Sequence, residues 1–362
     1  MAELRPASHG AAQGGPRRLP HRQGRGDESL RPRPEGQLLR GRRGVGQWDR
    51  SRARDAGVGL VTAPALDLGG VLIPTATPFD PVTGELDLVA LRANLRRWLE
   101  SGVLGVVLGG STGEAVLLDE RERLSSLEAS RDVVPDDRLL VAGTGLESTR
   151  ATIALTREAA MRGADAALVQ PPAFYRGAMT PAVLRDHYRA LADVSPIPIL
   201  LYQVPLRMST VELPAGLVAE LARHPNIIGM KDSRGEMDKL GELVRQVPSD
   251  FQLLVGNGAR LFAALEIGAV GGILGVANLV PDESARIVRA FRGGDTGLAG
   301  RLQGVIGPLH TGIVGAFGVP GVKAALDALG FQGGLPRPPL APLSDADRTV
   351  VEQRMRDAGL EF

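Results

Sequence analysis

Cysteine is absent from this 362-residue chain, and lysine is rare, with only three lysines among 42 basic residues. The lack of cysteine excludes disulfides, thiolate metal sites and cysteine nucleophiles, and it fits a reducing compartment such as the cytoplasm. No uninterrupted apolar run approaches the roughly 20 residues of a membrane span. A formal net charge of +1 gives no basic field for nucleic acid. We therefore expect a cytoplasmic protein whose partners are small molecules or copies of itself.

The segment 1–66 differs in composition from the rest of the chain. Residues 1–60 contain 13 arginines against 6 acidic residues, many Gly and Pro, and no sustained apolar periodicity. Such a segment cannot bury enough apolar surface to offset the entropy lost on ordering, so we predict a disordered extension. An arginine-rich leader leaves a mitochondrial transit peptide, and hence the matrix, as a minor alternative. Translation from a wrongly chosen upstream start is another explanation.

Eight short apolar runs follow, separated by amphipathic helical patterns. They lack polar alternation, as expected for parallel strands buried on both faces. The runs are VLIPTAT from Val71, GVVLGG from Gly105, RLLVAG from Arg138, DAALVQ from Asp165, IPILLY from Ile197, NIIGMK from Asn226, FQLLVG from Phe251 and AVGGILG from Ala269. Eight such units in residues 67–293 predict a (β/α)8 TIM barrel. A doubly wound open sheet is the rival, but no strand precedes a convincing G-x-G-x-x-G turn.

Residues 294–362 form a predicted C-terminal helical extension, with helices near 298–312, 320–329 and 345–357. Two helix starts within the barrel carry capping signals. Thr180 precedes Pro181, a cap followed by proline at the first helical position, and Asp119 is followed by Glu122 in the spacing of a capping box.

Four side chains with useful chemistry follow predicted strands. Lys231 ends the sixth run, Tyr202 ends the fifth, and Ser111 and Thr112 come after the second. In (β/α)8 barrels the C-terminal strand ends surround the active site. A desolvated lysine amine can attack a ketone to form a Schiff base, and a tyrosine hydroxyl linked to Ser111 or Thr112 can relay the protons. These residues could carry out this chemistry, with Lys231 as the nucleophile.

Less specialised interpretations are open for the same residues. Lys231 could pair with the adjacent Asp232, and Tyr202 could simply cap the core. The other two lysines, Lys239 and Lys323, lie inside helical patterns and are predicted to be solvated.

Two other functions are alternatives from different classes. A barrel that kept the fold but serves only to bind a small molecule is one. A phosphate-handling barrel isomerase is the other, because glycine-rich segments at 255–260 (VGNGAR) and 272–278 (GILGVAN) follow the last two strands, where barrels often bind phosphate. No spacing of histidines indicates a metal site.

Taken together, motifs between residues 68 and 360 resemble the dihydrodipicolinate synthase and N-acetylneuraminate lyase family. The motifs are PTATPF (74–79), GGSTGE (109–114), AGTG (142–145), YQVP (202–205) and GMKDS (229–233). The resemblance implies a class I aldolase that uses pyruvate and an aldehyde, needs no cofactor, and assembles as a homodimer or homotetramer. FYRGAMT (174–180) and FGVPGVKAALDALGF (317–331) look most like 4-hydroxy-2-oxoglutarate aldolase within that family.

The resemblance also implies catalytic roles. Lys231 would be the Schiff-base lysine and Tyr202 the proton-shuttling phenol. Ser111 and Thr112 would hold the pyruvate carboxylate and pass protons, although the synthases usually have two threonines there. Tyr175 matches the family's second tyrosine, which is lent across a tight dimer interface.

Further positions concern the substrate. Ser233 would line the pocket, and Ile273 matches a position whose backbone carbonyl lies near the substrate. Arg207 matches the arginine with which the synthases bind the acceptor's carboxylate, whereas vertebrate-type hydroxyoxoglutarate aldolases have asparagine there. Cleavage of 4-hydroxy-2-oxoglutarate is therefore the main interpretation. Condensation of pyruvate with aspartate semialdehyde, the reaction of 4-hydroxy-tetrahydrodipicolinate synthase, is the alternative.

Overall fold

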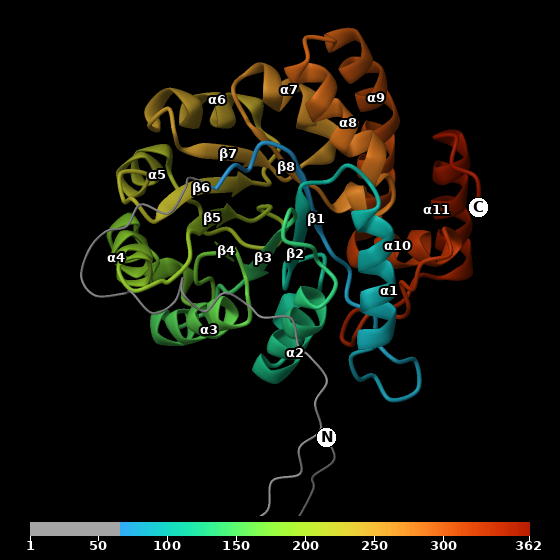
Figure 1. Cartoon of the computed structure of the whole chain (residues 1–362), viewed down its shortest axis with the longest axis horizontal. Helices are drawn as coiled ribbons and strands as arrows, with labels where there is room; N and C mark the ends of the chain where they lie inside the picture. The colour runs from blue at the N-terminus through green and yellow to red at the C-terminus, as the bar shows by residue number, and fades with distance from the viewer. Residues whose placement is uncertain (1–65) are drawn as a thin grey trace, which may run out of the picture. The chain divides into compact units, whose positions relative to one another are not determined.

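Eight parallel strands close into a barrel in the computed structural model, which describes residues 66–362 (Figure 1). Each strand pairs with the next in chain order, and β8 pairs with β1. The strands are β1 (Val71–Pro74), β2 (Gly105–Leu108), β3 (Leu139–Gly143), β4 (Ala166–Val169), β5 (Ile199–Gln203), β6 (Ile227–Asp232), β7 (Gln252–Val255) and β8 (Gly271–Ile273). The predicted (β/α)8 barrel is confirmed. The extension predicted for 1–66 lies outside the described residues, except for its last position.

Side chains on each strand alternate between two buried layers. On β5, Leu200 and Tyr202 belong to a small cluster made mostly of strand residues, which fills the barrel interior. Ile199 and Leu201 belong to the larger layer between the strands and the surrounding helices. Because both layers exclude water, the strands are continuously apolar rather than alternating.

Helices surround the barrel, as Figure 1 shows. They are α1 (Leu88–Leu99), α2 (Glu120–Arg131), α3 (Thr149–Met161), α4 (Pro181–Ala192), α5 (Ala215–Leu221), α6 (Met237–Gln246), α7 (Leu261–Glu266) and α8 (Pro281–Arg292). Short 3₁₀ turns lie at Ala115–Leu117, Arg176–Ala178, Gly258–Arg260 and Gly275–Asn278. The capping box of Asp119 and Glu122 is confirmed, as is the Thr180 cap with Pro181 at the first helical position of α4.

The C-terminal extension consists of α9 (Thr296–Leu309), a π-helical segment (His310–Gly315), α10 (Ala316–Ala328) and α11 (Asp345–Asp357). By length and composition alone, the stretch Thr296–Ala328 could cross a membrane. It is not one straight helix, because Gly318 adopts φ 61° and ψ −142° within it. Its first part, α9, packs along α8.

Lys323 in α10 does not follow the prediction. It was expected in solvent, but its side chain is 1% exposed and pairs with Glu114 in the loop after β2. The helical pattern of α10 placed Lys323 on the helix correctly. The prediction of solvation was wrong because the carboxylate that pairs with the Lys323 amine lies far away in the sequence, where the helical pattern gives no sign of it.

Candidate active site

The Lys231 amine lies beside the ring of Tyr202 at the C-terminal mouth of the barrel. The register of β5 and β6 places the two residues opposite each other, and Lys231 Nζ is 4.3 Å from the ring centroid. Both residues are about 95% buried, with 5% and 4% of their surfaces exposed. The pairing follows from the fold, since residues in register on neighbouring parallel strands point to the same face of the sheet, here the barrel interior.

Burial alone would raise the pKa of the Tyr202 phenol, because it disfavours the phenolate. The charge of Lys231 and the hydrogen-bonding groups around the phenol outweigh this effect, so the pKa of Tyr202 lies below its ordinary value near 10. The hydroxyl oxygen of Tyr202 is 3.3 Å from Ser111 Oγ. A phenol with a lowered pKa, linked to a second hydroxyl, is suited to exchange protons.

Asp232 is not the partner of Lys231. Its carboxylate accepts hydrogen bonds from the backbone N–H of Arg234 at 2.8 Å and from the Arg234 guanidinium, whose Nε lies 3.0 Å from Oδ2. Within residues 66–362, Lys231 forms no ion pair with a carboxylate. The interpretation that Lys231 forms a salt bridge with Asp232 is therefore wrong. The amine lies over the ring of Tyr202 instead.

A tight turn after β2 carries Ser111 and Thr112. The turn is closed by hydrogen bonds from the N–H groups of Gly113 and Ala115 to the carbonyl of Gly110, at 3.0 and 3.3 Å. Among the described residues, the backbone N–H groups of Ser111 and Thr112 have no acceptor. Two adjacent free N–H groups beside a hydroxyl can bind a carboxylate. Of the two hydroxyls, it is that of Ser111 which reaches Tyr202.

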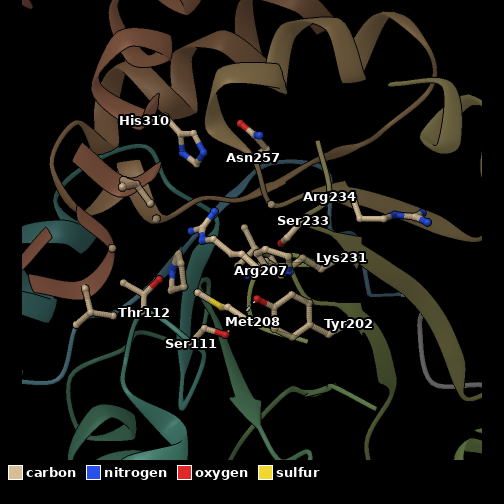
Figure 2. Close-up of a pocket in the computed structure, with 18 of the residues that line it drawn as sticks. Ser111, Thr112, Tyr202, Arg207, Met208, Lys231, Ser233, Arg234, Asn257 and His310 are labelled. Atoms are coloured by element: carbon tan, nitrogen blue, oxygen red, sulfur yellow. Dashed lines mark hydrogen bonds between the residues drawn. The ribbon is translucent and has the colours of Figure 1, made fainter. Parts of the chain in front are cut away.

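These residues surround a cavity of about 310 Å³ (Figure 2). Seven of the eight predicted site residues line it: Ser111, Thr112, Tyr202, Arg207, Lys231, Ser233 and Ile273. The structure thus brings them together from the C-terminal ends of four strands, β2, β5, β6 and β8, and from the loops that follow them. Their chemical roles stay predictions.

Ser233 offers an unused hydrogen-bonding group in this cavity. Its Oγ is buried near the Tyr202 phenol, whose pKa it helps to lower, but it makes no hydrogen bond of good geometry among the described residues. A buried hydroxyl without a partner costs free energy, so it is well placed to bond a substrate atom.

Arg207, Asn257 and His310 also line the cavity. Figure 2 shows the guanidinium of Arg207 on the His310 side. Burial, together with the charge of Arg207, lowers the pKa of His310 to about 4, so its ring is neutral near pH 7. His310 Nδ1 accepts a hydrogen bond from the N–H of Gly258 at 3.2 Å, which leaves Nε2 as the ring's donor.

Arg207 makes no hydrogen bond or ion pair with any residue that the structure describes. It lies in a turn closed by the N–H of Met208 and the carbonyl of Pro205, at 2.8 Å. Arg234 also lines the cavity but is occupied by Asp232, so Arg207 is the guanidinium available to an anion.

Tyr175 is the predicted site residue that the cavity does not include. It lies in the loop after β4, is 72% exposed, and stacks edge to face on Phe174 with ring centroids 5.0 Å apart. The loop is fixed at its start, because Glu147 accepts hydrogen bonds from the N–H groups of Ala173 and Phe174. The fold therefore presents an aromatic pair to the exterior at the mouth end of β4.

Among the cavity residues that the sequence did not single out are His310 and Asn257. His310 had no signal, because it falls in the π-helical segment inside a pattern that predicts plain helix. Asn257 lies in the VGNGAR segment, whose glycines pointed instead to phosphate. Its place beside the other cavity residues depends on the closure of the barrel.

Known proteins similar to this chain match most of its length. The Dihydrodipicolinate synthetase family matches residues 67–358. A probable mitochondrial 4-hydroxy-2-oxoglutarate aldolase from Emericella nidulans is 35% identical over 298 residues, 81% of this chain and 96% of the relative. A 4-hydroxy-tetrahydrodipicolinate synthase from Xanthomonas axonopodis is 38% identical over 294 residues, 81% of this chain and 95% of the relative.

The fold has a similar counterpart of known structure. The chloride-inhibited dihydrodipicolinate synthase from Acinetobacter baumannii, complexed with pyruvate, superposes with a TM-score of 0.77 at 30% identity. The match covers 82% of this chain and 100% of the other.

Proposed function

Because the chain belongs to the dihydrodipicolinate synthetase family, whose members are aldolases and lyases, we propose that it forms a Schiff base through Lys231 and cleaves 4-hydroxy-2-oxoglutarate to pyruvate and glyoxylate. The observation that carries this proposal is the Lys231 amine, buried beside the Tyr202 phenol at 4.3 Å and unpaired with any described carboxylate. Such a lysine is able to act as a nucleophile.

Lys231 begins the reaction by attacking C2 of the 2-oxo acid. The carbinolamine then loses its hydroxyl as water, with a proton supplied by Tyr202, and becomes an iminium ion. The Tyr202 phenolate left by that step takes the proton of the 4-hydroxyl and the C3–C4 bond breaks. Its electron pair forms the C2–C3 double bond of the enamine, the iminium pair returns to nitrogen, and glyoxylate leaves. Protonation of C3 and hydrolysis of the iminium release pyruvate and free Lys231.

Two anionic groups of the substrate need partners. The free N–H groups and the hydroxyls of Ser111 and Thr112 support binding of the carboxylate next to the reacting carbonyl. The unpaired guanidinium of Arg207, with the neutral His310 ring nearby, supports binding of the carboxylate at the other end. The site therefore suits a short dicarboxylic 2-oxo acid.

Arg207 also favours a second candidate. An acceptor such as aspartate semialdehyde carries a carboxylate that the same guanidinium could bind, which would make the reaction a condensation with the pyruvate enamine. Relatives with each activity match this chain to a similar degree.

We further infer that the active form is a homodimer or homotetramer, supported by the exposed pair Phe174 and Tyr175 at the barrel mouth. Tyr175 would enter the cavity of a neighbouring copy and join its proton relay. A native mass of a single chain, with full activity at that mass, would contradict this inference.

Steady-state kinetics with both substrates tests the proposed reaction. We expect kcat/KM for cleavage of 4-hydroxy-2-oxoglutarate, measured as pyruvate formed, to exceed kcat/KM for condensation with aspartate semialdehyde. The reverse order would establish the synthase activity. Arg207→Ala should raise KM for either substrate about 10- to 100-fold, as expected for the loss of a hydrogen-bonded charge pair.

A further inference from the structure

The ion pair between Lys323 and Glu114 is the most deeply buried charge pair among the described residues. Lys323 Nζ lies 2.6 Å from Glu114 Oε1, and the two side chains are 1% and 0% exposed. Lys323 Nζ also donates to the carbonyl of Leu335 at 2.8 Å and lies 4.4 Å from the ring centroid of Phe79. Charges removed from water in this way require well-placed partners, and the reaction proposed above uses neither residue.

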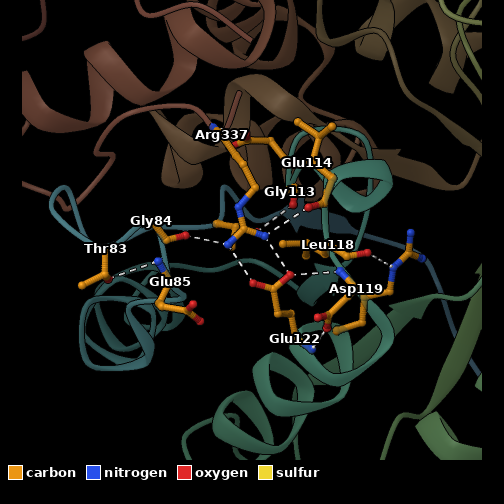
Figure 3. A network of polar contacts seen from close by, with 12 residues as sticks. Thr83, Gly84, Glu85, Gly113, Glu114, Leu118, Asp119, Glu122 and Arg337 are labelled. Carbon is orange, nitrogen blue, oxygen red and sulfur yellow. Dashed lines mark hydrogen bonds and ion pairs between the residues drawn. The ribbon is translucent and has the colours of Figure 1, made fainter. Parts of the chain in front are cut away.

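Glu114 holds the C-terminal extension at a second point. Its Oε2 accepts the backbone N–H of Arg337 at 2.7 Å. The Arg337 guanidinium in turn reaches Glu122 through two bonds of 2.7 Å and the carbonyl of Gly84 at 2.6 Å (Figure 3). One carboxylate thus joins α10 and the segment after it to the loop that follows β2.

Glu114 itself has an unusual backbone. It is the one non-glycine residue with positive φ in the described part of the chain, at 57°. A left-handed conformation is unfavourable for a residue with a β-carbon and persists where the surroundings impose it. Here the ion pair with Lys323 fixes the Glu114 side chain. The backbone N–H of Glu114 also donates a hydrogen bond of 3.2 Å to the carbonyl of Ser111.

The strained position lies next to the proposed carboxylate site. Glu114 follows Ser111 and Thr112 in the same turn, and Ser111 Oγ is 3.3 Å from the Tyr202 hydroxyl. Val322, the residue before Lys323, lines the cavity. A shift of the ion pair would therefore move the cavity wall and the turn together.

We propose that Lys323 is a positioning residue for the pyruvate carboxylate: through its buried pair with Glu114 it holds the turn so that Ser111 and Thr112 face the substrate and Tyr202. This inference rests on the proposed Schiff-base function. It explains why a chain with so few lysines has one inside α10. It also gives the C-terminal extension a role in positioning the residues that bind the substrate.

Borohydride trapping of the pyruvate adduct at increasing pyruvate concentrations tests the inference in full-length protein. Lys323→Met should raise the pyruvate concentration for half-maximal trapping about 10- to 100-fold, since carboxylate contacts are lost. The trapping rate at saturating pyruvate should change much less, because Lys231 and Tyr202 are untouched. Cleavage kinetics should show the same division between KM and kcat.

Second variants allow for failure of Lys323→Met to fold. Glu114→Gln keeps the shape and the bond from the Arg337 N–H, while the double variant Glu114→Gln/Lys323→Met leaves no unpaired buried charge. All three variants remove the same ion pair. The pyruvate concentration for half-maximal trapping should therefore be similar in the double variant and in the single variants, and the effects of the single variants should not multiply.

Asn94→Ala is the matched control. Asn94 exchanges hydrogen bonds of 2.9 and 3.0 Å with Gln332, so it fastens the same segment to α1 without touching Glu114. It should lower the melting temperature with half-saturation within about twofold of wild type.

Three results would count against the inference. A folded Lys323→Met or double variant with wild-type half-saturation overturns it. An equal rise in Asn94→Ala would show general loosening of the extension and would overturn it too. Absence of any adduct in wild type would instead overturn the proposed function, and the positioning role with it.

Discussion

The three lysines differ in what surrounds each amine. Lys239 is half-exposed and lies 3.9 Å from Glu242, an arrangement of little energetic weight. Lys323 is buried against a carboxylate. Lys231 is buried against a phenol ring with no carboxylate paired to it in the described residues. Of the three, Lys231 is therefore the lysine whose amine can react with a small ketone bound in the cavity.

Tyr202→Phe tests the proton relay at the same scale. The substitution keeps the ring beside Lys231 and removes the hydroxyl, so kcat should fall about 10²- to 10⁴-fold, the range for a general acid or base. In wild type, activity should fall as pH rises through the pKa of Tyr202, below 10, because the phenol then has no proton to give. The variant's residual activity should lack this alkaline limb in pH–rate profiles. Near-wild-type kcat would contradict the assignment.

At the scale of secondary-structure elements, the sequence predicted best those elements that are buried on both faces. Seven of the eight strands were predicted to within two residues at each end, and β1 to within three, because strands buried on both faces are continuously apolar. The π-helical segment and the break at Gly318 could not be predicted from hydrophobic periodicity. Each only shifts the positions of the apolar residues along the chain, and the shifted pattern is still typical of a helix. The cavity residues on strand ends could therefore be predicted, while His310 and the partner of Lys323 could not.

Gly143→Ala tests how β3 fixes the turn after β2. A methyl group there would lie 2.0 Å from the carbonyl oxygen of Gly109, so β2 and β3 must separate. We expect a loss of about 1–3 kcal/mol in the free energy of unfolding, as for overpacking, and weaker pyruvate binding.

The matched control for that change is Gly300→Ala in α9, where a methyl group meets nothing within 4 Å. Helix propensity predicts a gain of up to about 1 kcal/mol at this position, with unchanged pyruvate binding. Urea unfolding of both variants measures the two effects. Equal stability of the Gly143 and Gly300 variants would contradict the close approach of β2 and β3.

At the scale of the whole molecule, two buried histidines link folding to pH. Burial lowers the pKa of His187 to about 4, and burial with the charge of Arg207 does the same for His310. Unfolded histidine titrates near 6.5, so both contributions are fully present above that pH. They are lost as pH falls toward 4, because the unfolded chain then binds protons that the folded chain does not.

We expect each histidine to reduce the free energy of unfolding by about 3 kcal/mol between pH 6.5 and 4. Urea unfolding at a series of pH values measures the loss. His187→Asn keeps a hydrogen-bonding group for Thr149, which lies 2.8 Å from His187 Nδ1, and should show a shallower acid dependence than wild type. An identical dependence in both proteins would exclude His187 as a source.

The central claim is that Lys231 is the nucleophile, and borohydride reduction in the presence of pyruvate tests it most directly. The chain has only three lysines, so peptide mass spectrometry can examine every candidate side chain. We predict one reduced pyruvate adduct, on the peptide that contains Lys231, and none in Lys231→Met. An adduct on Lys239 or Lys323 alone, or no adduct with folded wild-type protein and excess pyruvate, would contradict the claim.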